Sequence, residues 1–259
     1  MSVKKKVPRI DYNQHFDSRA YLKFFEVEPS MHGFLPFVLR HLNNTFSSGN
    51  LKGKKLIDLG SGPTIHIIIS ASKYFEEIVA SDLTSGSRRE IEKWLKKEED
   101  CFNWRPFIEF VCEMEGRSSR SPEEVEQRLR QIVQVLKCDV TLENPFHPLP
   151  MEPADCITCS LCLEEACEDE EEYDRAIGSI AALLKPGGSL VLTDILNQSC
   201  GVMGEQTFGC LALTQSQVEE TLKGHGFSIK EFDTQPATEF EKKYIDGDPF
   251  FYLVAQKTE

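Results

Sequence analysis

Short runs of aliphatic and β-branched residues alternate along the chain with longer segments whose apolar and charged positions follow a helical period. The run 54–59 predicts a strand, and a Gly-Ser-Gly-Pro turn follows it at 60–63. A helix is predicted over 65–72 and a second strand over 77–82. Because a strand, a turn, a helix and a second strand form a βαβ unit, this region predicts a parallel sheet.

The alternation continues through the rest of the chain. Further helices are predicted over 88–99, 122–136, 171–184 and 218–225, and further strands over 155–163 and 189–194. Two late β-rich runs, 227–232 and 250–255, predict a C-terminal hairpin. Residues 1–50 are expected to be helical and rich in aromatic side chains. We therefore expect a single α/β domain over 1–259, with a cap or lid at 1–50 and a ligand-binding core at 51–259.

Composition narrows the possible partners. The 259 residues carry a formal net charge of −13, with 40% hydrophobic and 27% charged positions, which is typical of a globular protein. Binding to nucleic acid needs a basic surface, so it is not expected. No apolar run approaches the roughly 18 residues of a membrane span, and no apolar segment typical of a secretory signal follows the N-terminus. We expect a cytoplasmic monomer that acts on a small molecule, without nucleic-acid or membrane partners.

The nine cysteines predict reduced thiols rather than a metal site. Cys156, Cys159 and Cys162 lie in the predicted strand 155–163, and Cys167 follows it. Neighbouring strand residues point to opposite faces, and each residue advances the chain by about 3.3 Å. One tetrahedral metal ion cannot collect thiols arranged in this way, so we expect small buried side chains and no bound metal.

A glycine turn and a later acidic residue predict a nucleotide site. Gly60 and Gly62 let the backbone approach a ligand closely, and the helix start that follows favours an anionic group. Position 65 is Ile, where dinucleotide-binding loops carry a third small residue, so a pyrophosphate is poorly accommodated. Asp82 ends the second strand about 20 residues later, where it can accept the hydroxyls of a ribose. S-adenosylmethionine fits this combination; another nucleotide or a plain structural turn are the alternatives.

Two more aspartates are candidates for the same site. Asp58 stands just before the glycine turn, where it either hydrogen-bonds the loop or faces the sulfonium or amino group of the cofactor. Asp139 is placed at the end of a third strand, where a carboxylate can accept a hydrogen bond from the adenine amino group. An ordinary turn residue is the alternative for Asp139.

Four segments carry a resemblance to a known family. They are LIDLGSGPTI at 56–65, EKWLKKE at 92–98, VLKCDV at 135–140 and LLKPGG at 183–188. These segments, and a likeness that runs from 16–22 to 253–257, resemble the nicotinamide, indolethylamine, thioether and phenylethanolamine methyltransferases. The resemblance implies a class I S-adenosylmethionine-dependent methyltransferase fold. That fold has a Rossmann-like, seven-stranded, mostly parallel sheet, an antiparallel last strand and an N-terminal helical lid.

The resemblance also implies roles in binding the cofactor. Tyr21 matches a lid tyrosine, Asp82 the ribose carboxylate, and Asp139 and Val140 the adenine contacts. The implied cofactor is S-adenosylmethionine, which becomes S-adenosylhomocysteine.

Two positions depart from the family: Ser87 stands where relatives often carry Asn, and His66 where they carry Tyr. The residues implied to bind the cofactor are Tyr21, Gly60, Ser61, Gly62, Thr64, His66, Asp82, Ser87, Asp139, Val140 and Ser160.

The resemblance implies catalytic roles for Glu164 and Asp246, beside Tyr21 in the lid. Both acidic residues match positions that the phenylethanolamine enzyme places near its amine. An aliphatic amine must lose a proton before it can accept a methyl group, and Glu164 could take that proton directly or through water. The alternative for Glu164 is a solvated position at a helix start.

The acceptor end of the chain departs further from the family. His66, Gly201, Cys210 and Phe240 replace two tyrosines, a small hydroxyl residue and a C-terminal tyrosine of relatives. Three hypotheses therefore stay open. The first is N-methylation of nicotinamide, a related pyridine or an arylalkylamine; the second is S-methylation of a thioether. The third is a catalytically weak protein that holds the cofactor.

Overall fold

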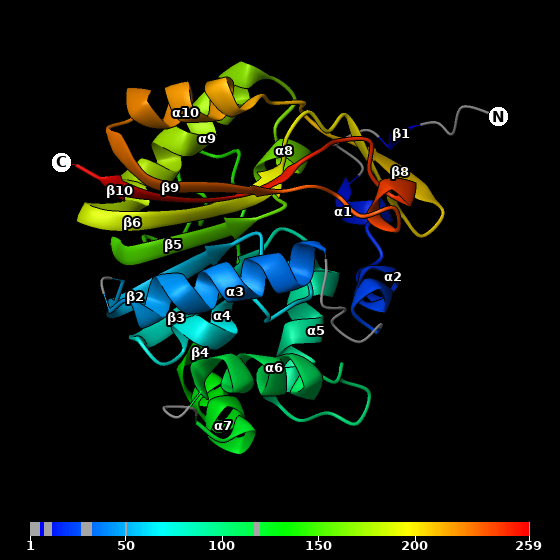
Figure 1. Ribbon diagram of the computed structural model, residues 1–259, viewed down its shortest axis with the longest axis vertical. Coiled ribbons are helices and arrows are strands. Elements are labelled where there is room, and N and C mark those ends of the chain that lie inside the picture. The colour runs from blue at the N-terminus through cyan, green and yellow to red at the C-terminus, as the bar shows by residue number, and fades with distance from the viewer. Residues whose placement is uncertain (1–5, 8–11, 27–32, 50, 117–119, 259) are drawn as a thin grey trace.

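A seven-stranded sheet runs through the centre of the computed structural model, which describes residues 6–7, 12–26, 33–49, 51–116 and 120–258 (Figure 1). The strand order is β4-β3-β2-β5-β6-β10-β9. In chain order the strands are β2 (Gly53–Leu59), β3 (Phe75–Asp82), β4 (Val133–Lys137), β5 (Ala154–Ser160), β6 (Leu184–Ile195), β9 (Phe227–Gln235) and β10 (Phe250–Lys257). Only β10 runs antiparallel to its neighbours, so the predicted fold class and C-terminal hairpin are confirmed.

Helices cover both faces of this sheet. They are α3 (Phe34–Ser47), α4 (Ile68–Ala71), α5 (Ser85–Leu95), α6 (Arg105–Glu115) and α7 (Pro122–Ile132) on one face, and α8 (Leu163–Ala166), α9 (Glu170–Leu183) and α10 (Gln215–Gly224) on the other. Neighbouring strand residues serve opposite faces: Leu56 packs in the first core cluster and Ile57 in the second. Cys156 and Cys159 divide in the same way. Burial on both faces explains the apolar runs in the central strands, such as Leu190-Val191-Leu192 of β6.

Some element boundaries differ from the predictions. The expected helix 122–136 ends at Ile132, and β4 begins at Val133 and pairs with β3. The helix starts with a capping box at Ser121 and Glu124. It ends before Val133-Gln134-Val135, because the β-branched valines favour a strand that pairs with β3. At the predicted breaker 185–188 the ladder between β5 and β6 is interrupted by a register shift.

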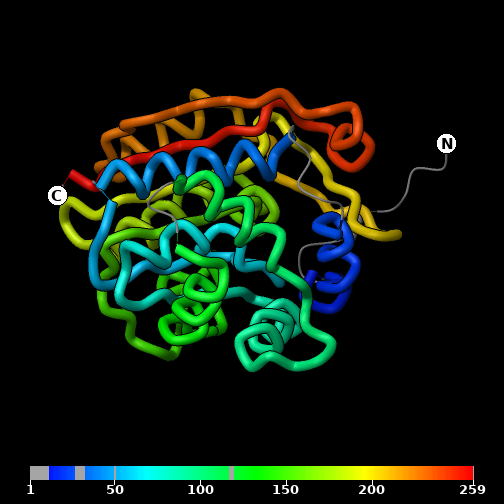
Figure 2. Tube along the Cα trace, turned by 60° about the horizontal axis from the view of Figure 1, so that its bottom comes forward, coloured from blue at the N-terminus to red at the C-terminus, as the bar shows by residue number. Residues whose placement is uncertain are grey.

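A small second sheet, absent from the predictions, stands beside the N-terminal helices. It contains β1 (Lys6–Val7), β8 (Gln206–Gly209) and β7 (Cys200–Met203). The helices α1 (Tyr12–His15) and α2 (Ser18–Leu22) and the 3₁₀ turn η2 (Lys23–Phe25) lie next to it (Figures 1 and 2). The expected cap at 1–50 is thus divided, because α3 packs into the main core.

The chain leaves β2 through a left-handed turn. Gly60 has a φ of +67° and Gly62 a φ of +58°, values that glycine adopts at little cost. A Cβ atom on Gly60 would overlap the sulfur of Cys162, which follows β5. The turn therefore requires glycine at position 60 for two independent reasons.

We expect Gly60→Ala to lower the free energy of unfolding by about 2–4 kcal/mol, because it adds left-handed strain to the overlap with Cys162. Gly187→Ala is the matched control: Gly187 has a φ of +76°, and a Cβ there would meet open space. That variant should lose only about 1–2 kcal/mol. Urea denaturation measures both, and equal losses would show that contact with Cys162 contributes nothing.

Candidate active site

A cavity of about 370 Å³ opens at the carboxyl ends of β2, β3 and β5. The strand order reverses between β2 and β5, and open α/β sheets bind ligands in the crevice at such a point. The residues predicted to bind the cofactor that line this cavity are Tyr21, Gly60, Ser61, Gly62, Thr64, His66, Asp82, Asp139, Val140 and Ser160. Ser87 is the one predicted binder outside the lining, and Asp58 also lines the cavity.

Hydrogen bonds hold the glycine turn against the neighbouring strands. The Ser61 amide donates to the Ser81 carbonyl at 2.8 Å, and the Ser81 amide donates to Ser61 Oγ at 3.0 Å. Ser81 Oγ donates to the Asp58 carbonyl at 2.8 Å, and Thr158 Oγ1 donates to the Asp58 carboxylate at 2.6 Å. Burial raises the pKa of Asp58 to about 6, although hydrogen bonds from Ser61 and Thr158 oppose the shift. These bonds join β2, β3 and β5 at the cavity floor.

Asp82 is held at the end of β3 with its carboxylate in the cavity wall. Its Oδ2 accepts the Gly62 amide at 3.0 Å, and its Oδ1 accepts the amide and hydroxyl of Thr84, both at 2.8 Å. Burial raises the pKa of Asp82, and these hydrogen bonds oppose the rise. A carboxylate offers about four acceptor positions, so Oδ2 can still accept a ligand hydroxyl.

Tyr21 on α2 stands over the glycine turn, as a lid residue should. A Cβ on Gly62 would lie 4.0 Å from Tyr21 Cε1. The Tyr21 ring is 5.6 Å from the rings of Phe16 and Phe25, measured between centroids. Burial is the main cause of the raised pKa of Tyr21, and the Glu165 carboxylate adds to it. The phenol therefore stays protonated and can donate a hydrogen bond into the cavity.

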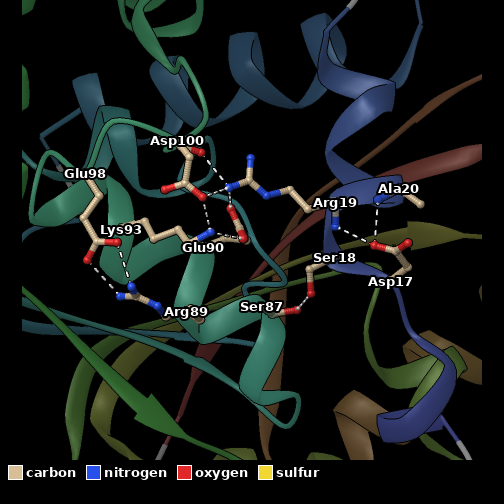
Figure 3. A network of polar contacts seen from close by, with 10 residues as sticks. All are labelled: Asp17, Ser18, Arg19, Ala20, Ser87, Arg89, Glu90, Lys93, Glu98 and Asp100. Atoms are coloured by element: carbon tan, nitrogen blue, oxygen red, sulfur yellow. Dashed lines mark hydrogen bonds and ion pairs between the residues drawn. The ribbon is translucent and has the colours of Figure 1, made fainter.

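An ion-pair network ties this lid helix to α5 (Figure 3). Arg19 lies 2.9 Å from Glu90 and 3.1 Å from Asp100, and Lys93 lies 2.6 Å from Asp100. The side chain of Glu90 is only 8% exposed, so its pair with Arg19 is screened less by solvent than the pairs of Asp100. The network fixes where α2, and with it Tyr21, sits above the turn.

Ser87 joins the same attachment rather than the cavity wall. Its hydroxyl lies 3.3 Å from Ser18 Oγ on α2 and 2.7 Å from Thr84 Oγ1, and Thr84 in turn donates to Asp82. The prediction that Ser87 contacts the cofactor therefore differs from the structure. Ser87 is fully buried and links the lid to the carboxylate instead.

His66 is a buried polar side chain in the cavity wall whose two ring nitrogens have no hydrogen-bond partner among the described residues. Its ring packs 5.1 Å from Phe25 and 6.2 Å from Trp104, between centroids. Burial lowers the pKa of His66 to about 3, so the ring is neutral at pH 7 and offers one donor and one acceptor. A buried polar group without a partner fits a polar ligand, such as the amino-acid end of S-adenosylmethionine.

The part of the cavity that Asp139 and Val140 line is suited to the adenine ring. Asp139 Oδ1 accepts the Thr141 amide at 3.1 Å and the Thr141 hydroxyl at 2.7 Å, which leaves Oδ2 for a ligand donor. Val140 adds a buried apolar contact. Ser160 lies at the other end of the lining, 2.7 Å from the hydroxyl of Thr193.

A second, mostly apolar cavity of about 480 Å³ adjoins the first. Its walls come from the N-terminal helices, the start of α3, the β7–β8 hairpin and residues 238–250. Gly201 and Phe240, two of the positions that depart from the family, are in its lining. The two cavities share five lining residues: Tyr12, Phe16, Tyr21, Leu161 and Glu165.

The structure does not bring Asp246 or Cys210 to either cavity lining. The Asp246 carboxylate accepts the Ser199 amide at 2.8 Å, the Ser199 hydroxyl at 2.6 Å and the Cys200 amide at 2.9 Å. It therefore caps the start of β7, and its predicted catalytic role is not supported by its position. These hydrogen bonds also hold the pKa of Asp246 below its usual value, against the effect of burial.

Glu164 also faces away from both cavities, whereas its neighbour Glu165 lines both. Residues one apart on a helix point about 100° away from each other, so the two glutamates of α8 cannot share one environment. Glu164 is fully buried beside Asp194, and burial, then repulsion from that carboxylate, raises the pKa of Glu164 well above its usual range. Of the two glutamates, only Glu165 is therefore placed to meet a ligand in either cavity. The only sequence signal for Glu165 was the Glu-Glu pair itself.

Solved structures with this fold include methyltransferases that bind S-adenosylmethionine or S-adenosylhomocysteine. A magnesium protoporphyrin IX methyltransferase from Synechocystis with bound S-adenosylmethionine superposes with a TM-score of 0.59 at 16% identity, over 96% of this chain and 94% of that one. The N-methyltransferase NodS from Bradyrhizobium japonicum, in complex with S-adenosylhomocysteine, gives 0.53 at 11% identity over 96% and 97%. At this identity the likeness defines the fold.

No helix among the described residues is both long and apolar enough to cross a membrane.

The chain belongs to the NNMT/PNMT/TEMT family, whose model matches residues 4–258, and it is a methyltransferase that uses S-adenosylmethionine. It is 41% identical over 251 residues to a human nicotinamide N-methyltransferase, covering 95% of this chain and 94% of that protein. Identity to a rabbit indolethylamine N-methyltransferase is also 41% over 251 residues, with 95% of each covered. A human phenylethanolamine N-methyltransferase is 33% identical over 254 residues, covering 94% and 89%.

Asp82→Asn should weaken binding of S-adenosylhomocysteine by about 10- to 100-fold, because a ribose hydroxyl loses a charged acceptor worth roughly 1.5–3 kcal/mol. Isothermal titration calorimetry measures the change. Asp233→Asn on β9 makes the same substitution away from both cavities and should leave the affinity unaltered. If Asp82→Asn binds S-adenosylhomocysteine as tightly as the wild type, the ribose hydroxyls do not bind to Asp82.

Glu165→Gln should stabilise the ligand-free protein more at pH 9 than at pH 5. Burial, with the nearby Asp194 and Asp82 carboxylates, raises the pKa of Glu165 from 4.5 to about 8. Between those pH values the folded state binds one proton more than the unfolded state, so the free energy of unfolding falls as pH rises. At pH 9 the folded protein carries the full free-energy cost of an ionised Glu165. Glutamine removes that cost.

Melting temperatures of the wild type and Glu165→Gln across this pH range measure the difference. Glu205→Gln, at an exposed position that lines neither cavity, is the control. A shift of the same size at both pH values would contradict the burial of an uncompensated Glu165.

Proposed function

We propose that this protein transfers a methyl group from S-adenosylmethionine to a nitrogen of a small molecule, either nicotinamide or a related pyridine, or an arylalkylamine. The observation that carries the proposal is the shared wall between the cavity with the ribose and adenine partners and the apolar second cavity. A ligand in the second cavity can reach a ligand in the first along that wall. The N-methyltransferase names of the relatives support nitrogen as the acceptor atom.

S-adenosylmethionine supplies an electrophilic methyl group when it is bound. The task of the protein is then to hold the acceptor nitrogen in line with that methyl group and to exclude water, which can contribute about 7–11 kcal/mol. The rings of Tyr12, Phe16 and Tyr21 close the shared border and are suited to both tasks. A pyridine nitrogen carries no proton and needs no base, whereas an ammonium must first lose one.

The proposal extends to the ten cavity-lining residues as cofactor partners, with Asp82 on the ribose, Asp139 and Val140 on the adenine, and His66 near the methionine portion. Residues 1–259 would act as one unit in which α1 and α2 form the lid. The net charge of −13 supports a small-molecule acceptor rather than a nucleic acid. We further propose a cytoplasmic monomer.

Incubation with labelled S-adenosylmethionine and separate acceptors tests this function. We expect transfer to nicotinamide or to 2-phenylethylamine by the wild type and loss of most of that activity in Asp82→Asn at limiting cofactor, because the ribose acceptor is gone. Mass spectrometry of the product locates the methyl group. Turnover of dimethyl sulfide without either nitrogen acceptor would transfer the assignment to S-methylation, and turnover of none would favour a cofactor-binding role.

A further inference from the structure

Among the described residues, the lining of the second cavity contains acidic side chains and no basic ones. Among its described lining residues the only charged side chains are Glu165 and Glu241. The Glu241 carboxylate holds neighbouring parts of the chain: it accepts the Phe34 amide at 2.7 Å, the Thr238 amide at 2.8 Å and the Thr238 hydroxyl at 2.7 Å. Of the two, only Glu165 also lines the first cavity, so it is the carboxyl placed between a ligand in one cavity and a ligand in the other.

Glu165 stands at the border of the two cavities, where no described residue forms an ion pair with it. The groups that face it are the Tyr12 and Tyr21 phenols from α1 and α2, the Asp82 carboxylate at the end of β3, the Asp194 carboxylate near the end of β6, and the Cys210 thiol. The Tyr12 phenol opposes the rise in the pKa of Glu165. Every ionisable neighbour named here is acidic or neutral, so this half-buried carboxylate lacks a compensating positive charge among the described residues.

We propose that Glu165 is a specificity-determining residue that selects a cationic arylalkylamine over an uncharged acceptor such as nicotinamide. Its carboxylate holds the ammonium group at the border, and the aromatic part of the ligand lies among Phe24, Phe25 and Phe34. This inference rests on the proposed methyl transfer for its chemistry. It differs from the sequence expectation, which gave the acidic role to Glu164.

The position also suits the proton step. As an N–H bond of the ammonium breaks, its proton forms an O–H bond with the Glu165 carboxylate, and the electron pair stays on nitrogen. That lone pair forms the new N–C bond while the S–C bond breaks and its electrons remain on sulfur. The methylated nitrogen then carries the positive charge that the sulfur gave up, and the carboxyl proton returns to solvent.

Binding of a cation should release a proton. The pKa of Glu165, raised to about 8 in the ligand-free protein, leaves most of this carboxyl protonated at pH 7. An ammonium beside it favours the ionised form, so affinity for the amine should rise from pH 6.5 to pH 8. An uncharged ligand has no such requirement.

The experiment uses 2-phenylethylamine and its uncharged analogue 2-phenylethanol, titrated into protein saturated with S-adenosylhomocysteine. Calorimetry at pH 7 in buffers of different ionisation enthalpy reports proton release. Glu165→Gln should weaken binding of 2-phenylethylamine by about 10- to 100-fold, because a charge-assisted hydrogen bond is lost. It should also abolish proton release, because the carboxyl that releases the proton is gone. It should leave the affinity for 2-phenylethanol and for nicotinamide unchanged, and Glu205→Gln should alter none of these values.

Equal losses for the amine and the alcohol would overturn the inference, because they indicate altered packing instead of charge recognition. Proton release that persists in Glu165→Gln would also overturn it. Because binding is measured without turnover, the experiment can contradict the role of Glu165 without contradicting the proposed methyl transfer, and the reverse. Glu165-dependent binding of the amine without methylation would contradict the proposed function alone. Methylation of the amine with unchanged affinity in Glu165→Gln would contradict the role of Glu165 alone.

Discussion

The joint at the carboxyl ends of β2, β3 and β5 is the constraint on which the site depends. Asp58 brings these three strands together by accepting hydrogen bonds from Ser81 and Thr158, while Ser61 bonds to Ser81 in both directions. Because all of these groups are buried, a lost partner would leave a desolvated polar atom. The joint fixes the path of the glycine turn, and the turn fixes how closely a cofactor can approach the backbone.

The lid depends on that joint through a chain of hydroxyl groups. Asp82 is anchored by the turn and by Thr84, and Ser87 connects Thr84 to Ser18 at the start of α2. The ion pairs of Arg19 hold the same helix from its outer side (Figure 3). Asp82 and helix α2 are thus connected through Thr84 and Ser87, so a substitution at either end is expected to shift the position of the other.

Burial separates the two glutamates of α8 into different chemistries. Glu164 and Asp194 lie away from both cavities, where burial raises the pKa of both carboxyls and repulsion from Asp194 adds to the rise at Glu164. Glu165 faces a cavity that a ligand can fill, so its charge can be compensated from outside the protein. This difference in access, and not the residue type, decides which carboxyl can take part in recognition.

The sequence by itself determined the local features of this protein. The βαβ pattern, the Gly60 turn and the spacing to Asp82 are short-range, and they predicted a parallel sheet and S-adenosylmethionine as the cofactor. The resemblance to the family added residues far from this unit, such as Tyr21 and Ser160, which line the same cavity in the structure. Tertiary structure decided what depends on distant partners: β4 replaced a helical end because β3 offered a ladder, and Ser87 and Asp246 turned to hydrogen bonds inside the fold. It also placed Glu165, and not Glu164, in the lining of the two cavities. In a four-residue helix there is too little periodicity to assign a face, so only packing against β6 and the lid could do so.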